Sequence, residues 1–192
     1  MSIIEKQAFL LDYNDNEQYA EIINENAFIG IKTFDLNNNP TGYMNIFFHP
    51  NKKLYLDTIY CYDQFRKSGI ATLISELADY ILREYNGYVI RGVYEPGQLS
   101  TDRENNIERS KEELEIAARK FYKKAEYIII EYEEYLKDKS KYPFLINEDF
   151  YIDEEGATTI VAKQIKQREY PYYEENGTTY HNNYTKPNFR KV

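Results

Sequence analysis

The sequence contains no tryptophan, one cysteine, two histidines and two methionines among its 192 residues. The single cysteine, Cys61, excludes an internal disulfide framework and a cysteine-rich metal site. His49 and His181 lie far apart in the sequence without companion ligands, so we expect no metal. We also expect Cys61 to be a packing residue and not a nucleophile, because no histidine lies near it in the sequence to activate the thiol.

Long hydrophobic runs are absent as well. The longest aliphatic run is the short YIII of residues 127–130, whereas a membrane-spanning helix needs about 20 apolar residues. No hydrophobic signal segment follows Met1. We therefore expect a soluble, cytoplasmic protein without a membrane partner.

Positive charge is scarce. There are 24 Lys and Arg residues against 32 Asp and Glu, which gives a formal net charge of −8. A general nucleic-acid-binding protein needs clustered positive charge to displace counterions, so we expect no nucleic-acid partner. An acidic surface instead favours cationic small molecules or protein lysines as partners, through weak steering.

The first third of the chain is typical of β-strands. AFLLDY at 8–13 and AFIGIKTF at 27–34 are short, apolar and rich in β-forming residues. The turn residues of Asp35–Gly42 separate the second of these from YMNIFFHP, which predicts a β-hairpin over residues 27–50. LYLDTIYCY at 54–62 is apolar on both faces, which predicts a central strand.

From Ile70 the apolar residues recur every three or four positions, which predicts a helix that ends near Asn86. YVIRGVYE at 88–95 predicts a strand. Ser110 and Glu113 fit a capping box at the start of a second helix. This order of elements predicts a mixed sheet with helices packed on it, in a mixed α+β or α/β fold.

The last third alternates between regular and irregular segments. EYIIIEYEEY at 126–135 predicts a strand, and ATTIVAKQI at 157–165 predicts the last strand of a single domain over 1–166. The residues between them, 136–156, read as an irregular insertion. The tail of 167–192 has aromatic but almost no aliphatic residues. It cannot form a core of its own and is either disordered or laid on another surface.

The segment RKSGIA, Arg66–Ala71, connects the central strand to the first predicted helix. A helix N-terminus offers unpaired backbone N–H groups and a positive dipole end to an anion, above all a phosphate. Gly69 lets a ligand approach the backbone closely, and the two basic residues add positive charge. The segment predicts a pyrophosphate cradle. An ordinary helix start with two solvated basic residues is the alternative.

Arg66–Ala71 is similar to the acyl-CoA pyrophosphate loop of the GNAT N-acetyltransferases, whose pattern is Gln/Arg-x-x-Gly-x-Gly/Ala. AARKFYKKAEY at 117–127 resembles the second signature of that family, a helix carrying Ala-x-x-aromatic-Tyr before a strand. The resemblance covers residues 54–135. It implies a GNAT-like, mostly antiparallel mixed sheet flanked by helices. It also implies acetyl transfer from acetyl-CoA to an amine without a covalent enzyme intermediate.

The resemblance further implies roles for individual residues. The pyrophosphate would bind the loop amides, and the pantetheine arm would pair with the end of the central strand, whose N–H groups would polarise the thioester carbonyl. Tyr122 matches the family's tyrosine that protonates the departing thiolate, and core packing is the other interpretation. The expected cofactor-binding residues are Ile59, Tyr60, Cys61, Arg66, Lys67, Ser68, Gly69, Ile70, Ala71 and Thr72.

Two carboxylates are candidates for the general base that removes a proton from the attacking amine. Asp57 is a lone carboxylate in an apolar strand, and Glu95 ends the next predicted strand. Either residue could instead bond to the backbone or face solvent. The sequence leaves the choice between them open.

Departures from the family pattern keep other functions open. Glu126 and Tyr127 stand where the family shows Gly-Phe, Glu115 stands where an Asn often contacts the cofactor, and the region before Ala27 is too strand-like for two N-terminal helices. One alternative is a non-catalytic acyl-CoA-binding regulatory module on the same fold. The other is an interaction module whose tail docks on a partner or on a second copy, as a homodimer. The acceptor itself is a small-molecule amine or a protein amine.

Overall fold

The computed structural model describes residues 5–13, 16–25, 27–48, 54–82, 87–93, 109–145, 159–165, 172–175, 178–181 and 189–191. The chain divides into two compact units. The first unit contains Met1–Gly87 and Ile165–Val192, and the second contains Tyr88–Gln164.

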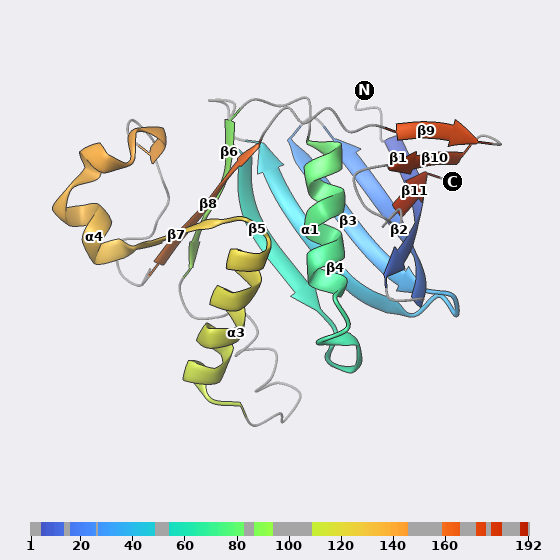
Figure 1. Cartoon of the computed structure of the whole chain (residues 1–192), viewed down its shortest axis with the longest axis horizontal. Helices are drawn as coiled ribbons and strands as arrows, with labels where there is room; N and C mark the ends of the chain where they lie inside the picture. Colours follow the sequence, from blue (N-terminus) through green and yellow to red (C-terminus); the bar gives the residue numbers. More distant parts are fainter. Residues whose placement is uncertain are drawn as a thin grey trace. The chain divides into compact units, whose positions relative to one another are not determined.

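The first unit is built on an antiparallel meander (Figure 1). Its five strands are β1 Glu5–Tyr13, β2 Asn16–Glu25, β3 Phe28–Asp35, β4 Pro40–Phe48 and β5 Leu54–Cys61. The hairpin predicted for residues 27–50 is confirmed as β3 and β4, and the predicted central strand as β5. The strand β2 has no counterpart among the named sequence patterns. Together with β1 it shows that the described residues before Ala27 form strands, as their sequence predicts.

Three short strands of the tail continue this sheet. They are β9 Tyr172–Glu175, β10 Thr178–His181 and β11 Phe189–Lys191, and the strand order is β5-β4-β3-β2-β1-β11-β10-β9. β11 pairs with β1 in antiparallel register, with Phe9 opposite Lys191. These strands agree with the interpretation that the tail lies on another surface, because β11 pairs with the edge of β1.

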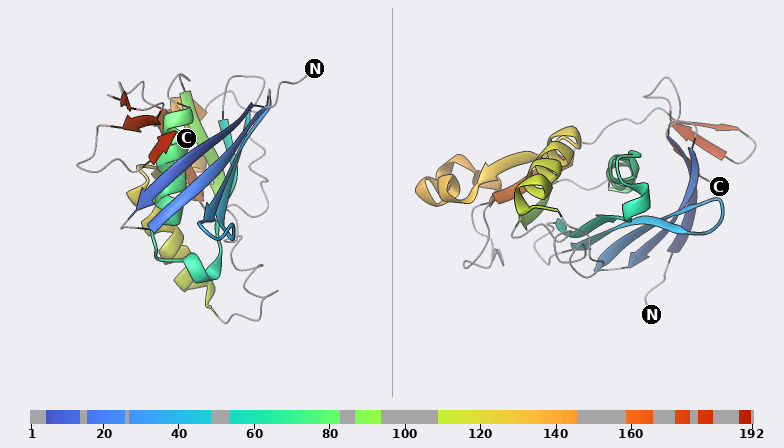
Figure 2. Two further views of the ribbon diagram at one scale, coloured as in Figure 1. Left: turned by 90° about the vertical axis from the view of Figure 1, so that its right-hand side faces the viewer. Right: turned by 90° about the horizontal axis from the view of Figure 1, so that it is seen from below.

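Helix α1, Ile70–Ile81, packs on one face of the meander, against β4 and its neighbours (Figure 2). Its predicted apolar stripe is confirmed, since Leu73, Ile74 and Leu77 are fully buried. Burial of each such side chain contributes about 1.5–3 kcal/mol. The helix ends at Ile81, and the stop predicted at Asn86 lies outside the described residues.

The sheet contributes alternate residues to this core, as expected for strands with one face buried. The fully buried side chains from the sheet include Ala20, Ile22, Ile29, Ile31, Met44, Ile46 and Leu56. Close packing of α1 requires a glycine at Gly42 in β4. A Cβ atom there would lie 2.8 Å from the carbonyl oxygen of Tyr60 and 2.9 Å from Cδ1 of Ile74.

Within its described residues, the second unit combines three strands with two helices and two short 3₁₀ turns. Its strand order is β7-β8-β6, and β7 pairs with β8 in antiparallel register. The elements are β6 Gly87–Val93, α3 Lys111–Lys124, β7 Ile128–Glu131, α4 Tyr132–Lys137, the turns Lys139–Lys141 and Pro143–Leu145, and β8 Thr159–Ile165. The capping box predicted at Ser110 and Glu113 is confirmed at the start of α3.

The strand predicted over 126–135 is wrong in its second half. It ends at Glu131, and α4 begins at Tyr132. Two acidic residues lie in the first turn of α4, where the helix dipole favours negative charge. Tyr135 is then buried with Ile130 and Leu145, so part of the predicted insertion joins the core. The fold class itself is confirmed: the fold is mixed α+β, with a mostly antiparallel sheet and helices.

Candidate functional site

The candidate site of the first unit begins at an irregularity in β5. Asn45 of β4 lies opposite Thr58, whereas the next residue of β4 lies opposite Leu56, so Asp57 is the extra residue of a β-bulge. A bulge redirects side chains that would otherwise alternate. Here the hydroxyl of Thr58 donates a hydrogen bond of 2.8 Å to Oδ2 of its neighbour Asp57. Asp57 is exposed, so the carboxylate predicted as a base is accessible to solvent.

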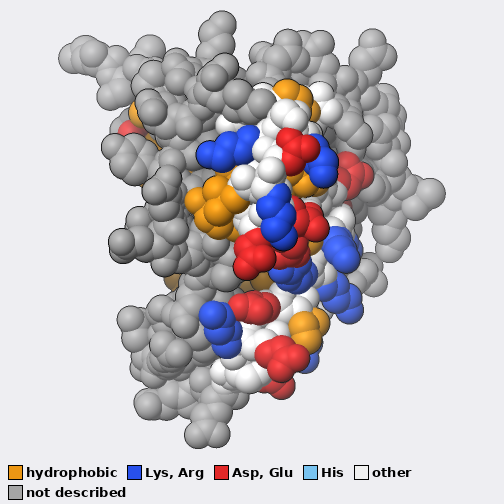
Figure 3. Space-filling model, turned by 90° about the vertical axis from the view of Figure 1, so that its left-hand side faces the viewer, with side chains coloured by type: hydrophobic (Ala, Val, Ile, Leu, Met, Phe, Trp, Pro, Cys, Tyr) orange, Lys and Arg blue, Asp and Glu red, His pale blue; other side chains and the backbone are white. Residues whose placement is uncertain are grey.

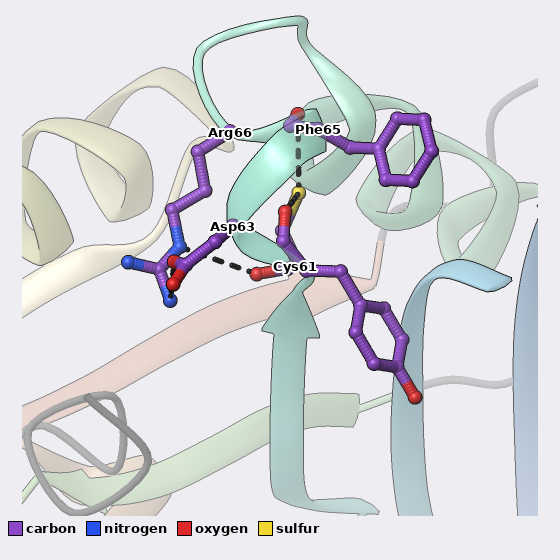
Figure 4. A network of polar contacts seen from close by, with 5 residues as sticks. Cys61, Asp63, Phe65 and Arg66 are labelled. Atoms are coloured by element: carbon purple, nitrogen blue, oxygen red, sulfur yellow. Dashed lines mark hydrogen bonds and ion pairs between the residues drawn. The ribbon is translucent and has the colours of Figure 1, made fainter. Parts of the chain in front are cut away.

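Arg66 links the turn after β5 to the end of that strand through a hydrogen bond and an ion pair (Figure 4). Nε of Arg66 donates to the carbonyl of Cys61 over 3.3 Å, and Nη2 lies 2.5 Å from Oδ1 of Asp63. The side chain of Arg66 is only 15% exposed. Its guanidinium therefore closes the turn and balances the charge of Asp63. A direct contact of Arg66 with a phosphate stays a prediction.

Cys61 points into the same turn (Figure 4). Its thiol donates a weak hydrogen bond of 3.3 Å to the carbonyl oxygen of Phe65. Burial raises the pKa of Cys61 to about 11. A thiol with this pKa is protonated near neutral pH and is a poor nucleophile. These observations agree with the packing role expected for Cys61.

The turn leads directly into α1 through two residues with positive φ. Lys67 has φ 63° and is exposed, and Gly69 has φ 91° as the N-cap of α1. Such a conformation is natural for glycine and strained for other residues. In the described chain, no side chain caps this helix, since the hydroxyl of Ser68 donates to the carbonyl of Phe65 instead.

The first helical hydrogen bond of α1 runs from the N–H of Leu73 to the carbonyl of Gly69 over 3.0 Å. The amides of Ile70, Ala71 and Thr72 thus precede the helical hydrogen-bond ladder. The first turn contains no acidic residue. The predicted loop residues therefore lie at a helix start that has no side-chain cap among the described residues.

Helix α3 shows the opposite arrangement. The hydroxyl of Ser110 accepts from the N–H of Glu113 over 3.1 Å, and the carboxylate of Glu113 accepts from the N–H of Ser110 over 3.0 Å. Glu112 adds a second negative charge to the first turn. The first turn of α3 is thus capped by its own side chains, whereas that of α1 has no side-chain cap.

Tyr122 lies in α3 of the second unit and is 6% exposed. Its ring contacts those of Phe121 and Tyr127, with centroids 5.2 and 5.3 Å away. The ammonium of Lys163 in turn lies 5.5 Å from the centroid of the Tyr127 ring. The loop residues and Asp57 belong to the first unit. A shared site of Tyr122 with acetyl-CoA stays a prediction, and Glu95 lies outside the described residues.

An aromatic cluster beside the bulge was not found as a unit from the sequence. It consists of Tyr43 in β4, Tyr60 in β5 and Tyr62 just beyond β5. The signal for Tyr60 and Tyr62 is their spacing of two, which places them on one side of an extended segment. The third member depends on the pairing of β4 with β5, where Tyr43 lies opposite Tyr60.

Charged side chains do not gather into a patch of one sign among the residues coloured in Figure 3, where Lys and Arg alternate with Asp and Glu. Over the described ranges, no three His, Cys, Asp or Glu residues lie together as a metal site would require. The helices described in the structure include none that is long and apolar enough to cross a membrane.

Comparisons with known proteins give similarity to solved structures. No family model and no curated protein matches the chain. A GNAT-family acetyltransferase from Staphylococcus aureus Mu50 is 13% identical, with a TM-score of 0.47, over 72% of this chain and 69% of that chain. The ribosomal-protein-S18-alanine N-acetyltransferase from Escherichia coli is 11% identical, with a TM-score of 0.43, over 77% and 76% of the two chains.

A third solved structure comes from Bacillus anthracis str. Ames. It is assigned as a streptothricin acetyltransferase and was solved in complex with acetyl coenzyme A. It is 14% identical to this chain, with a TM-score of 0.45, over 85% of this chain and 86% of that chain.

Proposed function

We propose that the protein is an N-acetyltransferase that moves an acetyl group from acetyl-CoA to a primary amine by direct attack. The observation that carries this proposal is the start of α1, which has Gly69 as its N-cap and no side-chain cap, in the turn that follows β5. An anion at a helix start gains backbone hydrogen bonds and a dipole interaction of about 0.3–1 kcal/mol. The diphosphate of CoA is such an anion. The activity agrees with that named for the similar solved structures.

In the proposed reaction the amine nitrogen attacks the thioester carbonyl carbon. A C–N bond forms, the C–S bond breaks, and the thiolate leaves as a thiol after protonation. Asp57 and Glu95 are the candidates for the base that takes the proton of the amine, and Tyr122 is the candidate acid. The exposed position of Asp57 at the bulge suits proton transfer to or from a substrate.

A second candidate function is a non-catalytic acyl-CoA-binding module. It is favoured by the burial of Tyr122 between two aromatic rings, which is the ordinary environment of a core tyrosine. The two functions share acetyl-CoA binding and differ in the release of free CoA. The cytoplasmic location, the kind of amine and a homodimer stay predictions.

Calorimetric titration of the full chain with acetyl-CoA tests the shared step. Gly69→Glu and Gly69→Gln form a matched pair, because both introduce a side chain of one size at the same strained backbone position. We expect Glu to abolish binding through charge repulsion with the diphosphate, and Gln to retain part of it. Equal affinity of Gly69→Glu and the unaltered protein would show that the helix start is not the phosphate site.

Thiol release in the presence of amines then separates the two functions. The expected result is stoichiometric release of CoA thiol with at least one amine. Cys61 is the only cysteine of the chain, so the protein contributes a single, constant thiol to the background. Binding of acetyl-CoA without thiol release for any amine would assign the protein to the non-catalytic module.

A further inference from the structure

Three tyrosines form a compact cluster next to the bulge of β5. The ring centroids of Tyr43 and Tyr60 are 5.3 Å apart, those of Tyr60 and Tyr62 are 5.2 Å apart, and those of Tyr43 and Tyr62 are 6.5 Å apart. The rings of Tyr60 and Tyr62 are nearly perpendicular, at 88°. All three residues are half-buried, so their ring surfaces are partly accessible.

The cluster lies on the face of the sheet that is turned away from α1. Gly42 faces Ile70 and Ile74 of that helix. Because successive residues of a strand point to opposite faces, the next residue, Tyr43, points to the other face. Tyr60, its partner in β5, shares that face.

A carboxylate lies in the same strand as Tyr60. The β-bulge places Asp57 beside Thr58, whose hydroxyl donates to it. Burial raises the pKa of Tyr43, and the nearby Tyr62, Tyr60 and Asp57 raise it further. The charge of Asp57 thus contributes to the raised pKa of Tyr43, beside the position that the bulge gives Asp57 in β5.

The cluster combines negative charge with electron-rich rings. The Lys–ring contacts that the structure describes lie elsewhere, at Tyr127 and Tyr135 of the second unit. In the strand pairs whose register is described, the basic residue opposite the cluster is Lys32 of β3, which pairs with Tyr43 and has an exposed side chain. Aromatic rings with an adjacent carboxylate are the surroundings that favour an ammonium group.

We propose that Tyr43, Tyr60 and Tyr62, together with the carboxylate of Asp57, bind the ammonium group of a cationic amine. This inference rests on the proposed function, because that amine is the acetyl acceptor. It narrows the acceptor from amines in general to those that are positively charged. It also fits the net charge of −8, which attracts cations to the protein as a whole.

The test measures ammonium binding without acetyl-CoA, so that it does not depend on turnover. Choline and 3,3-dimethylbutan-1-ol have the same shape, but only choline carries a positive charge. In calorimetric titrations of the full chain we expect choline to bind at least about tenfold more tightly than the neutral alcohol. Equal affinity for the two compounds would overturn the proposal.

Two variants of the cluster and one matched control test whether choline binds there. Asp57→Asn and Tyr60→Leu should each weaken choline binding at least about fivefold. Phe47→Leu is the matched control, because Phe47 lies in β4 on the same face, is 43% exposed and packs its ring on Phe28. It should leave choline affinity unchanged. Tyr62→Leu, beyond the end of β5, replaces Tyr60→Leu if the strand residue is needed for folding.

The outcomes separate this proposal from the proposed function. If Asp57→Asn binds choline as tightly as the unaltered protein and still binds acetyl-CoA, the proposed ammonium site is wrong and the proposed acetyltransferase function is unaffected. If the unaltered protein binds choline but does not bind acetyl-CoA, the proposed acetyltransferase function is wrong and the ammonium site still holds. Lys32→Ala checks the neighbouring cation, and we expect choline to bind this variant at least as tightly as the unaltered protein.

Discussion

The guanidinium of Arg119 donates two hydrogen bonds to the carboxylate of Glu131. One runs from Nη1 to Oε1 over 2.6 Å and the other from Nη2 to Oε2 over 3.0 Å. A third hydrogen bond of 3.3 Å runs from Nη2 to the hydroxyl of Thr159. The interaction joins α3 to β7 and β8 within the second unit. Such two-pronged pairing is the strong form of the Arg–carboxylate contact.

Glu131→Gln should lower the free energy of unfolding at about pH 7 by about 0.5–1 kcal/mol, because the side chains of Arg119 and Glu131 are 41% and 46% exposed and solvent screens the pair. The hydrogen bond from Arg119 lowers the pKa of Glu131 below its ordinary value of 4.5. The stabilisation is therefore present above that value and is lost as pH falls through the lowered pKa.

Urea unfolding at about pH 7 and about pH 3 measures this effect, and the difference between the unaltered protein and Glu131→Gln should shrink at the lower pH. Glu133→Gln is the control, because Glu133 is exposed and lies in the first turn of α4. A difference for Glu131→Gln that does not change with pH would contradict the pairing.

Gly42→Ala should destabilise the first unit by about 1–3 kcal/mol. The added methyl group would meet the backbone oxygen of Tyr60 at 2.8 Å, and a backbone atom cannot rotate away. Gly30→Ala is the matched control in the adjacent strand. Its methyl group would meet ring atoms of Phe28, also at 2.8 Å, but that side chain can turn. Thermal unfolding should therefore show a clearly larger loss of stability for Gly42→Ala. Equal losses would mean that the backbone at Tyr60 yields as easily as the side chain of Phe28.

Alkylation of Cys61 by iodoacetamide should be slow in the folded protein. Burial raises the pKa of its thiol to about 11 from an ordinary value of 9.0. Near pH 8 the reactive thiolate fraction is then about 100-fold smaller than in the unfolded chain. Rates with and without urea test this, and no assignment is needed because the chain has one cysteine. Similar rates in both conditions would show that the thiol is exposed in the folded protein.

The sequence predicts those elements of the fold in which local signals agree with packing. The 3.6-residue period from Ile70 gives α1, and the Ser110 and Glu113 pair gives the start of α3, because both signals act within one helix. The strand assigned to 126–135 fails at Tyr132 for the opposite reason. Its aromatic residues have high β propensity, but burial of Tyr135 with Leu145 and the acidic first turn favour a helix.

Some features of the candidate site follow from the sequence, and others depend on the folded structure. The loop from Arg66 to Ala71 is contiguous, so its position before α1 follows from the sequence. The direction of the Arg66 side chain does not, because it depends on the closing of the turn onto Asp63 and Cys61. The tyrosine cluster also needs the register of β4 with β5, which is set by a bulge at Asp57.

Tyr122→Phe separates catalysis from packing at the buried tyrosine of α3. Phenylalanine retains the ring contacts with Phe121 and Tyr127, with centroids at 5.2 and 5.3 Å, and removes only the hydroxyl. If the hydroxyl protonates the departing thiolate, kcat should fall by about 10²-fold or more while the Kd for acetyl-CoA stays unchanged.

Tyr127→Phe is the control for Tyr122→Phe, because Tyr127 is 7% exposed and belongs to the same group of rings. Its kcat should remain close to that of the unaltered protein. The alkaline limb of the pH–rate profile gives an independent reading, because it should change only in Tyr122→Phe. Equal turnover in the two variants would assign Tyr122 to the core of the second unit, and another group would then have to protonate the thiolate.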